Sequence, residues 1–331
     1  MRFVLDGSKP CLRRTGFIDE PPVQNSEFLV DTRSPPAYPE GNQVSLVTVV
    51  VLGMSLWAEA AVAHLPPGQS IVAVHLENGF TPIIDGELDD WEAVAPTLGM
   101  SGFTDLVTGA DADVIDFDLR VWIGWNDTEN RLYIAAEVKD DIHQVDRPAG
   151  TASNRIFQDD DLEVFVDADH SGGQFADFSE ASLDEQLARN GTEANHFVIA
   201  GPHEDGEYFV NFAAAGWYAL SDGPYTQAAV AFDEGVTRYE MSLVPFDRLN
   251  VTADFLSIRH DLRSGEAIGF NLEFSDFDTR SELFDAKWSL SGGFNAFRLS
   301  ERFVDLLLGP PRAATTVQDL SWGRIKASFR Q

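Results

Sequence analysis

The segment LRVWIGWNDTENRLYIAAEV, residues 119–138, decides the fold class. In its first seven residues every second side chain is apolar, and this period of two places one set of side chains in the core and the other on the opposite face of a β-strand. Residues 126–130, NDTEN, are turn formers, and residues 131–138 are again rich in apolar and aromatic side chains. The segment therefore predicts a β-hairpin. The expected core set of its first strand is Leu119, Val121, Ile123 and Trp125.

The same pattern continues through residues 70–309, where short stretches rich in Val, Ile, Phe and Tyr are separated by Gly, Asp, Asn and Pro. It predicts one all-β domain, an antiparallel β-sandwich of the immunoglobulin-like or jelly-roll type with short decorating helices. The best helical candidate, residues 180–189, is short and polar. Residues 310–331 are interpreted as a linker and a short C-terminal tail. Further strands are expected at 161–166, 195–200, 207–213, 227–232, 238–244 and 267–275.

One predicted strand, DLEVFV, contains a charge in an apolar setting. Leu162, Val164 and Val166 share its core face, so Glu163 lies in the middle of the strand on the opposite face. An unpaired carboxylate there would be costly. We expect Glu163 to have a partner, either a ligand hydroxyl or an arginine such as Arg120.

The composition is strongly acidic. Of 331 residues, 54 are Asp or Glu and 23 are Lys or Arg, which gives a formal net charge of −31. Such a surface repels phosphates, so nucleic acid and anionic membranes are poor partners. This acidity is typical of salt-adapted proteins and also of many secreted ones. The single cysteine, Cys11, excludes an intramolecular disulfide and a zinc site built from cysteines.

Residues 44–63 have the pattern of a targeting segment. Residues 44–58 are apolar throughout, and an A-x-A pattern follows at 61–63, as in a signal peptide. We expect a secreted or cell-surface protein, extracellular or periplasmic, whose mature form begins near His64. The alternative is a membrane anchor retained at 44–63. Residues 1–43 fit no leader pattern and are interpreted as a disordered stretch from a translation start placed too early.

Five segments, in order, resemble the family 9 carbohydrate-binding modules and their wider DOMON-like relatives. The first resembles the family's opening motif P-x-IDG-x-x-D-x-x-W. The second resembles a family segment that ends in V-x-D, and the third a strand with the pattern E-x-F-x-D. The last two resemble the family's E…IP…L strand and its late GFN…D…R…W pattern. Their order and spacing cover about residues 70–308. The segments are PIIDGELDDW (82–91), RVWIGWNDTENRLYIAAEVKDD (120–141), QDDDLEVFVDADHSGG (158–173), YEMSLVPFDRL (239–249) and IGFNLEFSDFDTR (268–280) followed by Lys287-Trp288.

The resemblance implies a sugar site in which aromatic faces stack on a pyranose and polar groups bond its hydroxyls. One stacking Trp of the family corresponds to Phe157, and the sugar-bonding Glu corresponds to Glu163. The second stacking Trp lies in a loop where Phe294 or Phe297 would take its role. A family Arg near 195–199 is replaced by Phe197 or His196. The expected sugar-binding residues are Phe157, Glu163, Phe294, Asn295, Phe297 and Arg120.

Each aromatic assignment has an alternative. Phe157, Phe294 and Phe297 could be ordinary core aromatics, and Glu163 could be part of a structural ion pair with Arg120 or another Arg. Three tryptophans that fit the family pattern are interpreted mainly as core residues. These are Trp91, Trp125 and Trp288.

The sequence DADHSG, residues 167–172, matches the opening D-x-D-x-S-G of a calcium loop, in which alternate oxygens converge on the ion. The match then fails, because position twelve is Phe178 instead of Glu. We expect a structural calcium here; the alternative is an acidic turn. A second acidic group, at 111–118, is interpreted as a solvated or salt-binding edge. The expected calcium ligands are Asp167, Asp169, Ser171 and Asp177.

Motifs of common enzymes are absent from the sequence: there is no H-E-x-x-H, no G-x-S-x-G and no G-x-G-x-x-G. Some DOMON-like relatives hold haem through Met and His, but no haem is expected here. The sequence therefore predicts a non-catalytic carbohydrate-binding module for xylan or cellulose oligosaccharide ends, accessory to polysaccharide breakdown and to a separate glycoside hydrolase. The alternatives are a glycoside hydrolase with an unrecognised site and a structural surface protein that has lost the sugar site.

Overall fold

The computed structural model describes residues 69–76, 80–145, 153–202, 209–212, 215–218, 220–278 and 283–311. The expected targeting segment at 44–63, the leader before it and the tail after residue 311 lie outside these residues. In the described part of the chain no helix is long and apolar enough to cross a membrane.

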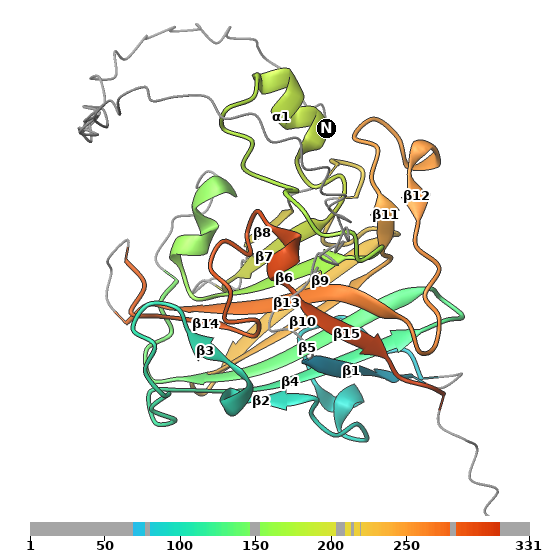
Figure 1. Ribbon diagram of the computed structural model, residues 1–331. Helices are drawn as coiled ribbons and strands as arrows, with labels where there is room; N and C mark the ends of the chain where they lie inside the picture. The colour runs from blue at the N-terminus through green and yellow to red at the C-terminus, as the bar shows by residue number, and fades with distance from the viewer. Residues whose placement is uncertain are drawn as a thin grey trace, which may run out of the picture. The chain divides into compact units, whose positions relative to one another are not determined.

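Two β-sheets pack face to face and share one strand, β1 (Figure 1). The first sheet has the order β8 (Phe209–Phe212), β7 (Asn195–Ala200), β6 (Asp161–Asp167), β13 (Ala267–Asp276), β15 (Val304–Leu308) and β1 (Ser70–His75). The second continues from β1 to β4 (Phe117–Asn126), β5 (Arg131–Asp140), β10 (Val236–Leu243) and β9 (Thr226–Asp233). The predicted β-sandwich is confirmed.

Strand β1 makes the one departure from antiparallel pairing in these sheets. Its first four residues, from Ser70 to Ala73, pair in parallel with β15, and Val74 and His75 pair in parallel with β4. Every other strand pair among the described residues is antiparallel. These parallel contacts were not expected from the sequence, because no local pattern shows which strands lie beside β1.

Short elements decorate the two sheets. Strand β2 (Leu98–Gly99) pairs with β4, and β3 (Thr104–Asp105) pairs with β14 (Ala286–Ser289), which itself pairs with the end of β13. Strands β11 (Phe246–Arg248) and β12 (Ile258–Arg259) form a separate pair. The single α-helix of the described residues, α1 (Leu183–Arg189), begins with a capping box made by Ser182 and Glu185. The 3-10 helices are η1 (Asp89–Trp91), η2 (Met100–Gly102), η3 (Ser153–Gln158), η4 (Asp254–Leu256) and η5 (Ser300–Arg302).

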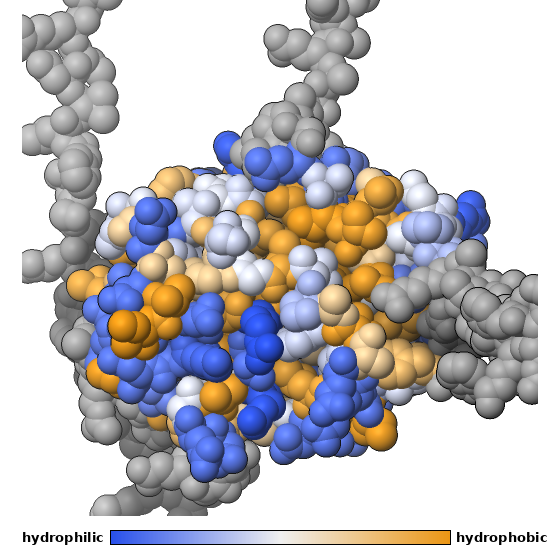
Figure 2. Space-filling model, turned by 90° about the horizontal axis from the view of Figure 1, so that it is seen from below, coloured by the Kyte–Doolittle hydropathy of each residue, from blue (hydrophilic) through white to orange (hydrophobic). Residues whose placement is uncertain are grey.

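The predicted hairpin is present as β4 and β5, whose ten residue pairs run from Phe117–Asp140 to Asn126–Arg131. The side chain of Asn126 closes the turn, since its Oδ1 accepts hydrogen bonds from the backbone N–H groups of Thr128 and Glu129. Alternate residues of β4 enter the core between the sheets, as expected: Leu119, Val121, Ile123 and Trp125. Figure 2 shows the face seen from below Figure 1, where hydrophilic and apolar side chains are mixed.

The family-like motif at 82–91 is tied to β10 through Glu240, which is fully buried. Its Oε2 accepts hydrogen bonds from the N–H groups of Asp85 and Gly86, both at 3.0 Å, and its Oε1 accepts one from the indole N–H of Trp91 at 3.0 Å. Gly86 has a φ of 86°, and a Cβ there would lie 3.1 Å from the Cβ of Ala231. The glycine and the tryptophan of this motif are therefore structural residues.

Candidate functional site

A pocket with a volume of about 580 Å³ opens on the outer face of the first sheet. Its floor is formed by side chains of β6, β7, β13 and β14 that point away from the core, and its walls come from η3 and from the segment after β14. The volume falls within the range of small-molecule sites. The lining residues are Leu106, Val107, Ile156, Phe157, Glu163, His196, Val198, Glu273, Phe284, Lys287, Phe294, Asn295, Ala296 and Phe297.

The alternation of β6 places Glu163 in this floor. Leu162, Val164 and Val166 belong to the core between the sheets, as the sequence predicts. Glu163 and Phe165 lie on the opposite face, where Phe165 stacks on the ring of His196 with centroids 4.1 Å apart. Glu163 is only 3% exposed, so its carboxylate reaches the pocket from an almost completely desolvated position.

The partners of Glu163 are Lys287 and His196. The Nζ of Lys287 lies 2.5 Å from Oε1, and the Nε2 of His196 lies 2.7 Å from Oε2. Both partners also line the pocket. The expectation that Arg120 would pair with Glu163 is wrong, because Arg120 lies on β4 in the second sheet and pairs there with Glu137 of β5. Arg120 is also absent from the pocket lining.

A second carboxylate, that of Glu273, lies beside the first. Glu273 is the cross-strand partner of Glu163, and its Oε2 is 3.4 Å from the Nζ of Lys287. Its Oε1 accepts hydrogen bonds from the Nδ2 of Asn271 and the Oγ of Ser289, both at 3.2 Å. The pocket floor thus contains two carboxylates around one ammonium group.

Burial and charge act in opposite directions on these groups. Burial disfavours the charged form of Glu163, but the charge of Lys287 and the contact with His196 prevail and lower its pKa to about 2. Burial raises the pKa of Glu273, and the neighbouring charge of Glu163 raises it further. Burial lowers the pKa of Lys287, but its carboxylate neighbours prevail and raise it above its ordinary value. Glu163 and Lys287 are therefore both charged at neutral pH, as an acceptor and a donor of hydrogen bonds.

Aromatic rings form the rim of the pocket. Phe157 is 41% exposed, Phe294 is 66% exposed and Phe297 is 45% exposed. The alternative that these three are ordinary core aromatics is therefore wrong. Asn295, with a φ of 67°, lies between the two late phenylalanines and also lines the pocket. Five of the six residues expected at the sugar site, all except Arg120, thus meet at one pocket.

Sequence reasoning missed three lining residues, Glu273, Phe284 and Lys287, and it did not foresee that His196 would contact Glu163. His196 was one of two candidates for the family's arginine position. The structure separates them, because Phe197 is fully buried in the core while His196 bonds Glu163. Lys287 precedes a core tryptophan, so its own side chain lies on the outer face of β14. It pairs there with Ser275 of β13, and this register brings its Nζ to Glu163. Only the strand register, which the sequence does not display, reveals that contact.

The expected calcium loop at 167–172 is held by its own hydrogen bonds. The carboxylate of Asp167 accepts N–H groups from Ser171 at 3.3 Å and from Gly172 at 2.8 Å. The carboxylate of Asp177 lies 3.2 Å from Arg298. Asp169 and Ser171 are exposed at the surface of the turn. Calcium binding at this loop stays a prediction, and the geometry also accommodates the alternative of an acidic turn.

The three expected core tryptophans are confirmed as core residues. Trp91 and Trp125 are each 1% exposed, and Trp288 is similarly buried. The indole N–H of Trp125 donates a hydrogen bond to the carbonyl of Gly309 at 3.0 Å. These rings are therefore unavailable for stacking on a sugar, and the exposed phenylalanines are the aromatic surface of the site.

The described residues form a β-sandwich with a pocket on one sheet that is rimmed by aromatic side chains. Residues 84–240 match the family described as "Carbohydrate family 9 binding domain-like". This match confirms the resemblance drawn from the sequence. The match includes Phe157, Glu163 and His196 but ends before β13, so Glu273 and Lys287 lie beyond it.

Solved structures of low sequence identity are also similar. A family 9 module from Caldicellulosiruptor kristjanssonii in complex with cellotriose is 17% identical, covers 75% of this chain and 98% of its own, and has a TM-score of 0.46. A family 9 module from the same organism in complex with glucose is 16% identical, covers 75% of this chain and 100% of its own, and has a TM-score of 0.47. A putative carbohydrate-binding protein from Bacteroides uniformis is 13% identical, covers 72% of this chain and 98% of its own, and has a TM-score of 0.36. The comparison with curated proteins found no match.

Proposed function

We propose that the pocket binds the end of a neutral oligosaccharide. The observation that carries this proposal is the combination of an exposed phenylalanine rim with a buried Glu163–Lys287 ion pair in the floor. Phenyl faces stack on the C–H face of a pyranose, while a carboxylate and an ammonium group bond its hydroxyls. Because the floor is a β-sheet, a sugar reaches Glu163 only from the outer side of the sheet.

The charge of the pocket favours neutral over acidic sugars. Two carboxylates, Glu163 and Glu273, surround the single ammonium of Lys287, so no free positive charge faces a ligand carboxylate. The whole chain carries a formal net charge of −31, which adds a repulsive field. Neutral glucan or xylan fragments therefore suit the site better than uronic acids.

Titration calorimetry of the full chain with glucose, cellotriose, xylotriose and glucuronic acid tests the proposal. Phenylalanine offers a smaller face than tryptophan, so we expect weak binding of the neutral sugars, with a Kd on the order of 1 mM. Glu163→Gln and Phe157→Ala weaken binding. Phe255→Ala, a change at an 81% exposed ring of η4 outside the pocket lining, serves as the matched control and leaves it unchanged.

Absence of neutral-sugar binding by a correctly folded protein would refute this function and favour a surface protein that has lost the sugar site. Equal binding by all three variants would place the site elsewhere. Binding of glucuronic acid in preference to glucose would contradict the charge argument alone.

We also propose that the protein is exported and assists polysaccharide breakdown by a separate glycoside hydrolase. The support is the signal-like pattern at residues 44–63 together with the acidic composition. Mass spectrometry of the protein from its native host tests export, with a mature N-terminus expected near His64. An intact chain beginning at Met1 and recovered from the cytoplasm would exclude it.

A further inference from the structure

One side of the pocket lies beyond the ion pair of the floor and takes no part in the proposed sugar contacts. Leu106 and Val107 follow β3, and Phe284 precedes β14, so these residues reach the pocket from two paired strands. We call these three residues the apolar wall. Their side chains contain no hydrogen-bond donor or acceptor. Val107 is 48% exposed, so the apolar wall is open to a ligand.

Hydrogen bonds fix the backbone of the apolar wall next to Lys287. The N–H of Leu106 donates to the carbonyl of Lys287 at 2.8 Å. The buried carboxylate of Asp105 accepts the N–H groups of Val107 at 2.8 Å and of Lys287 at 3.1 Å. This side of the pocket is therefore formed by the fold itself, before any ligand is bound.

The apolar wall lies directly beside the polar floor. The Nζ of Lys287 is 4.9 Å from the centroid of the Phe284 ring and 2.5 Å from the Oε1 of Glu163. All three residues line the same pocket. A sugar that bonds Glu163 thus has the apolar wall within reach of its substituents.

A second sugar ring does not suit the apolar wall, because its hydroxyls would leave water there without finding a partner. The polar groups of the floor are few, and they already contact one another. The Nζ of Lys287 lies 3.4 Å from Glu273 and 3.3 Å from the Oγ of Ser275, in addition to its contact with Glu163. The pocket volume of about 580 Å³ exceeds that of one sugar ring, so the remaining space favours an apolar group.

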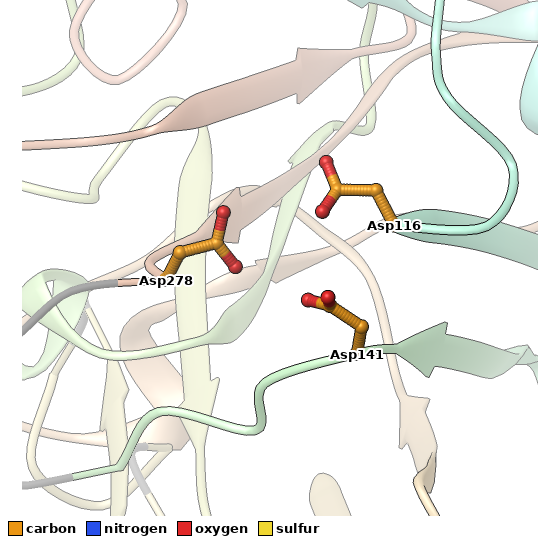
Figure 3. Close-up of side chains that lie close together, drawn as sticks. All are labelled: Asp116, Asp141 and Asp278. Carbon is orange, nitrogen blue, oxygen red and sulfur yellow. The ribbon is translucent and has the colours of Figure 1, made fainter.

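The charge behind the apolar wall favours a neutral group. Phe284 packs on the buried ring of Phe277, with centroids 4.9 Å apart, and Asp278 follows Phe277 in the chain. The carboxylate of Asp278 points toward the same space as those of Asp116 and Asp141 (Figure 3). An anionic substituent on the ligand would be repelled by this negative field.

We propose that the apolar wall binds a neutral aromatic group that the sugar carries, as an aryl glycoside or an aromatic ester. This inference rests on the proposed function, because the sugar ring has to bond Glu163. Aromatic rings pack on one another face to edge, which suits a ligand ring beside Phe284. The ammonium of Lys287 also attracts the face of an aromatic ring, and an alkyl chain of similar area offers no such attraction.

Titration calorimetry of the full chain with matched sugars tests the apolar wall. Phenyl β-D-glucoside is compared with methyl β-D-glucoside, and 6-O-benzoyl-D-glucose with 6-O-acetyl-D-glucose, because the two aromatic sugars carry the ring at different ends of the pyranose. At least one aromatic sugar should bind about tenfold more tightly than its matched partner. The corresponding hexyl glucoside or hexanoyl ester should bind at least about threefold more weakly than that aromatic sugar.

Two variants locate the aromatic group. Phe284→Ala and Val107→Asn should each lower the preference for the aromatic sugar by about threefold or more. Because Val107 is half exposed, its variant gives an answer even where Phe284→Ala fails to fold. Val251→Asn is the matched control, since Val251 is 40% exposed and lies outside the pocket lining, and it should keep the preference.

Three results overturn the inference. One is binding of the methyl or acetyl sugar with less than about a twofold gain from either aromatic group, which would leave the proposed sugar function standing. Another is an alkyl sugar that binds as tightly as the aromatic one. The third is a preference that persists in both Phe284→Ala and Val107→Asn. If no sugar binds, cellotriose included, the proposed function itself fails and this inference fails with it.

Discussion

Glu163 of β6 lies directly opposite Glu273 of β13, so two carboxylates share one cross-strand position in a buried floor. Like charges in this position destabilise a sheet. Lys287, whose Nζ lies 2.5 Å from Glu163 and 3.4 Å from Glu273, resolves the conflict. The cation of Lys287 thus offsets the repulsion between the two carboxylates.

Lys287→Met should therefore destabilise the protein by about 3–5 kcal/mol, because it leaves two buried carboxylates without their cation. Urea unfolding measures this loss. The double variant Lys287→Met/Glu163→Gln should recover part of it, since one of the charges is then removed. Lys139→Met, at an exposed lysine on β5, is the control and should change stability by less than about 0.5 kcal/mol. A loss below about 1 kcal/mol for Lys287→Met would mean that the pair contributes little.

Glu240 should make stability depend on pH. Burial raises its pKa to about 7, although three hydrogen-bond donors oppose this shift. As pH rises above the ordinary glutamate value of 4.5, the unfolded chain loses this proton first, so the fold loses stability until the pH passes the folded pKa near 7. Relative to Glu240→Gln, the wild type should lose up to about 3 kcal/mol between pH 4.5 and 7.

Unfolding in urea at a series of pH values, with the wild type and Glu240→Gln in parallel, measures this difference. Other acids titrate in both proteins, and their contribution cancels in the comparison. Parallel pH profiles for the two proteins would show that Glu240 is not the titrating group.

Gly86→Ala should destabilise the fold by about 3 kcal/mol, because the residue has a positive φ and its new Cβ would meet Ala231 at 3.1 Å. Gly109→Ala is a matched control: its φ is also positive, at 68°, but nothing lies within 4 Å of the added Cβ. The control should lower the free energy of unfolding by about 1 kcal/mol, because only the unfavourable positive φ of an alanine contributes there. Thermal or urea unfolding measures both losses. If Gly86→Ala and Gly109→Ala lose the same stability, the close contact with Ala231 contributes nothing.

Phe157→Trp should tighten the binding of cellotriose by about two- to fivefold, since a larger ring adds stacked area at the pocket rim. Titration calorimetry provides the measurement. Phe255→Trp, outside the pocket lining, should not change the affinity. Tightening by both variants would point to nonspecific stacking, and no change for Phe157→Trp would place the sugar away from this ring.

Much of the fold was predictable from the sequence because strand signals are local. The alternation in β4 and β6 identified the core residues, and it placed Glu163 on the outer face before any partner was known. The turn at 126–130 fixed the hairpin register for the same reason. Parallel pairing of β1 was not predictable, because no local pattern shows which strand lies beside it: β15 is more than two hundred residues away in the chain and β4 about fifty.

The site was predictable only in part. The phenylalanines and Glu163 were found through resemblance, but their cationic partners depend on which strand lies beside β6. Arg120 was assigned wrongly because the sequence does not show that β4 belongs to the other sheet. Lys287 and the aspartates at the ends of β5 and β13 become neighbours only through sheet pairing, which no local pattern encodes.

The position of β1 has a mechanical consequence. Ser70 to Ala73 pair in parallel with Asp305 to Leu308, so the chain enters β1 at the end of the ladder opposite to the one where it leaves β15. Force applied through these two chain segments would load the hydrogen bonds of the ladder in shear, all at once, and would not peel them apart one by one. Gly309, whose N–H bonds the carbonyl of Ala73 at 2.9 Å, adds a further link to this ladder. A domain pulled through both of these chain segments would therefore resist unfolding along this direction.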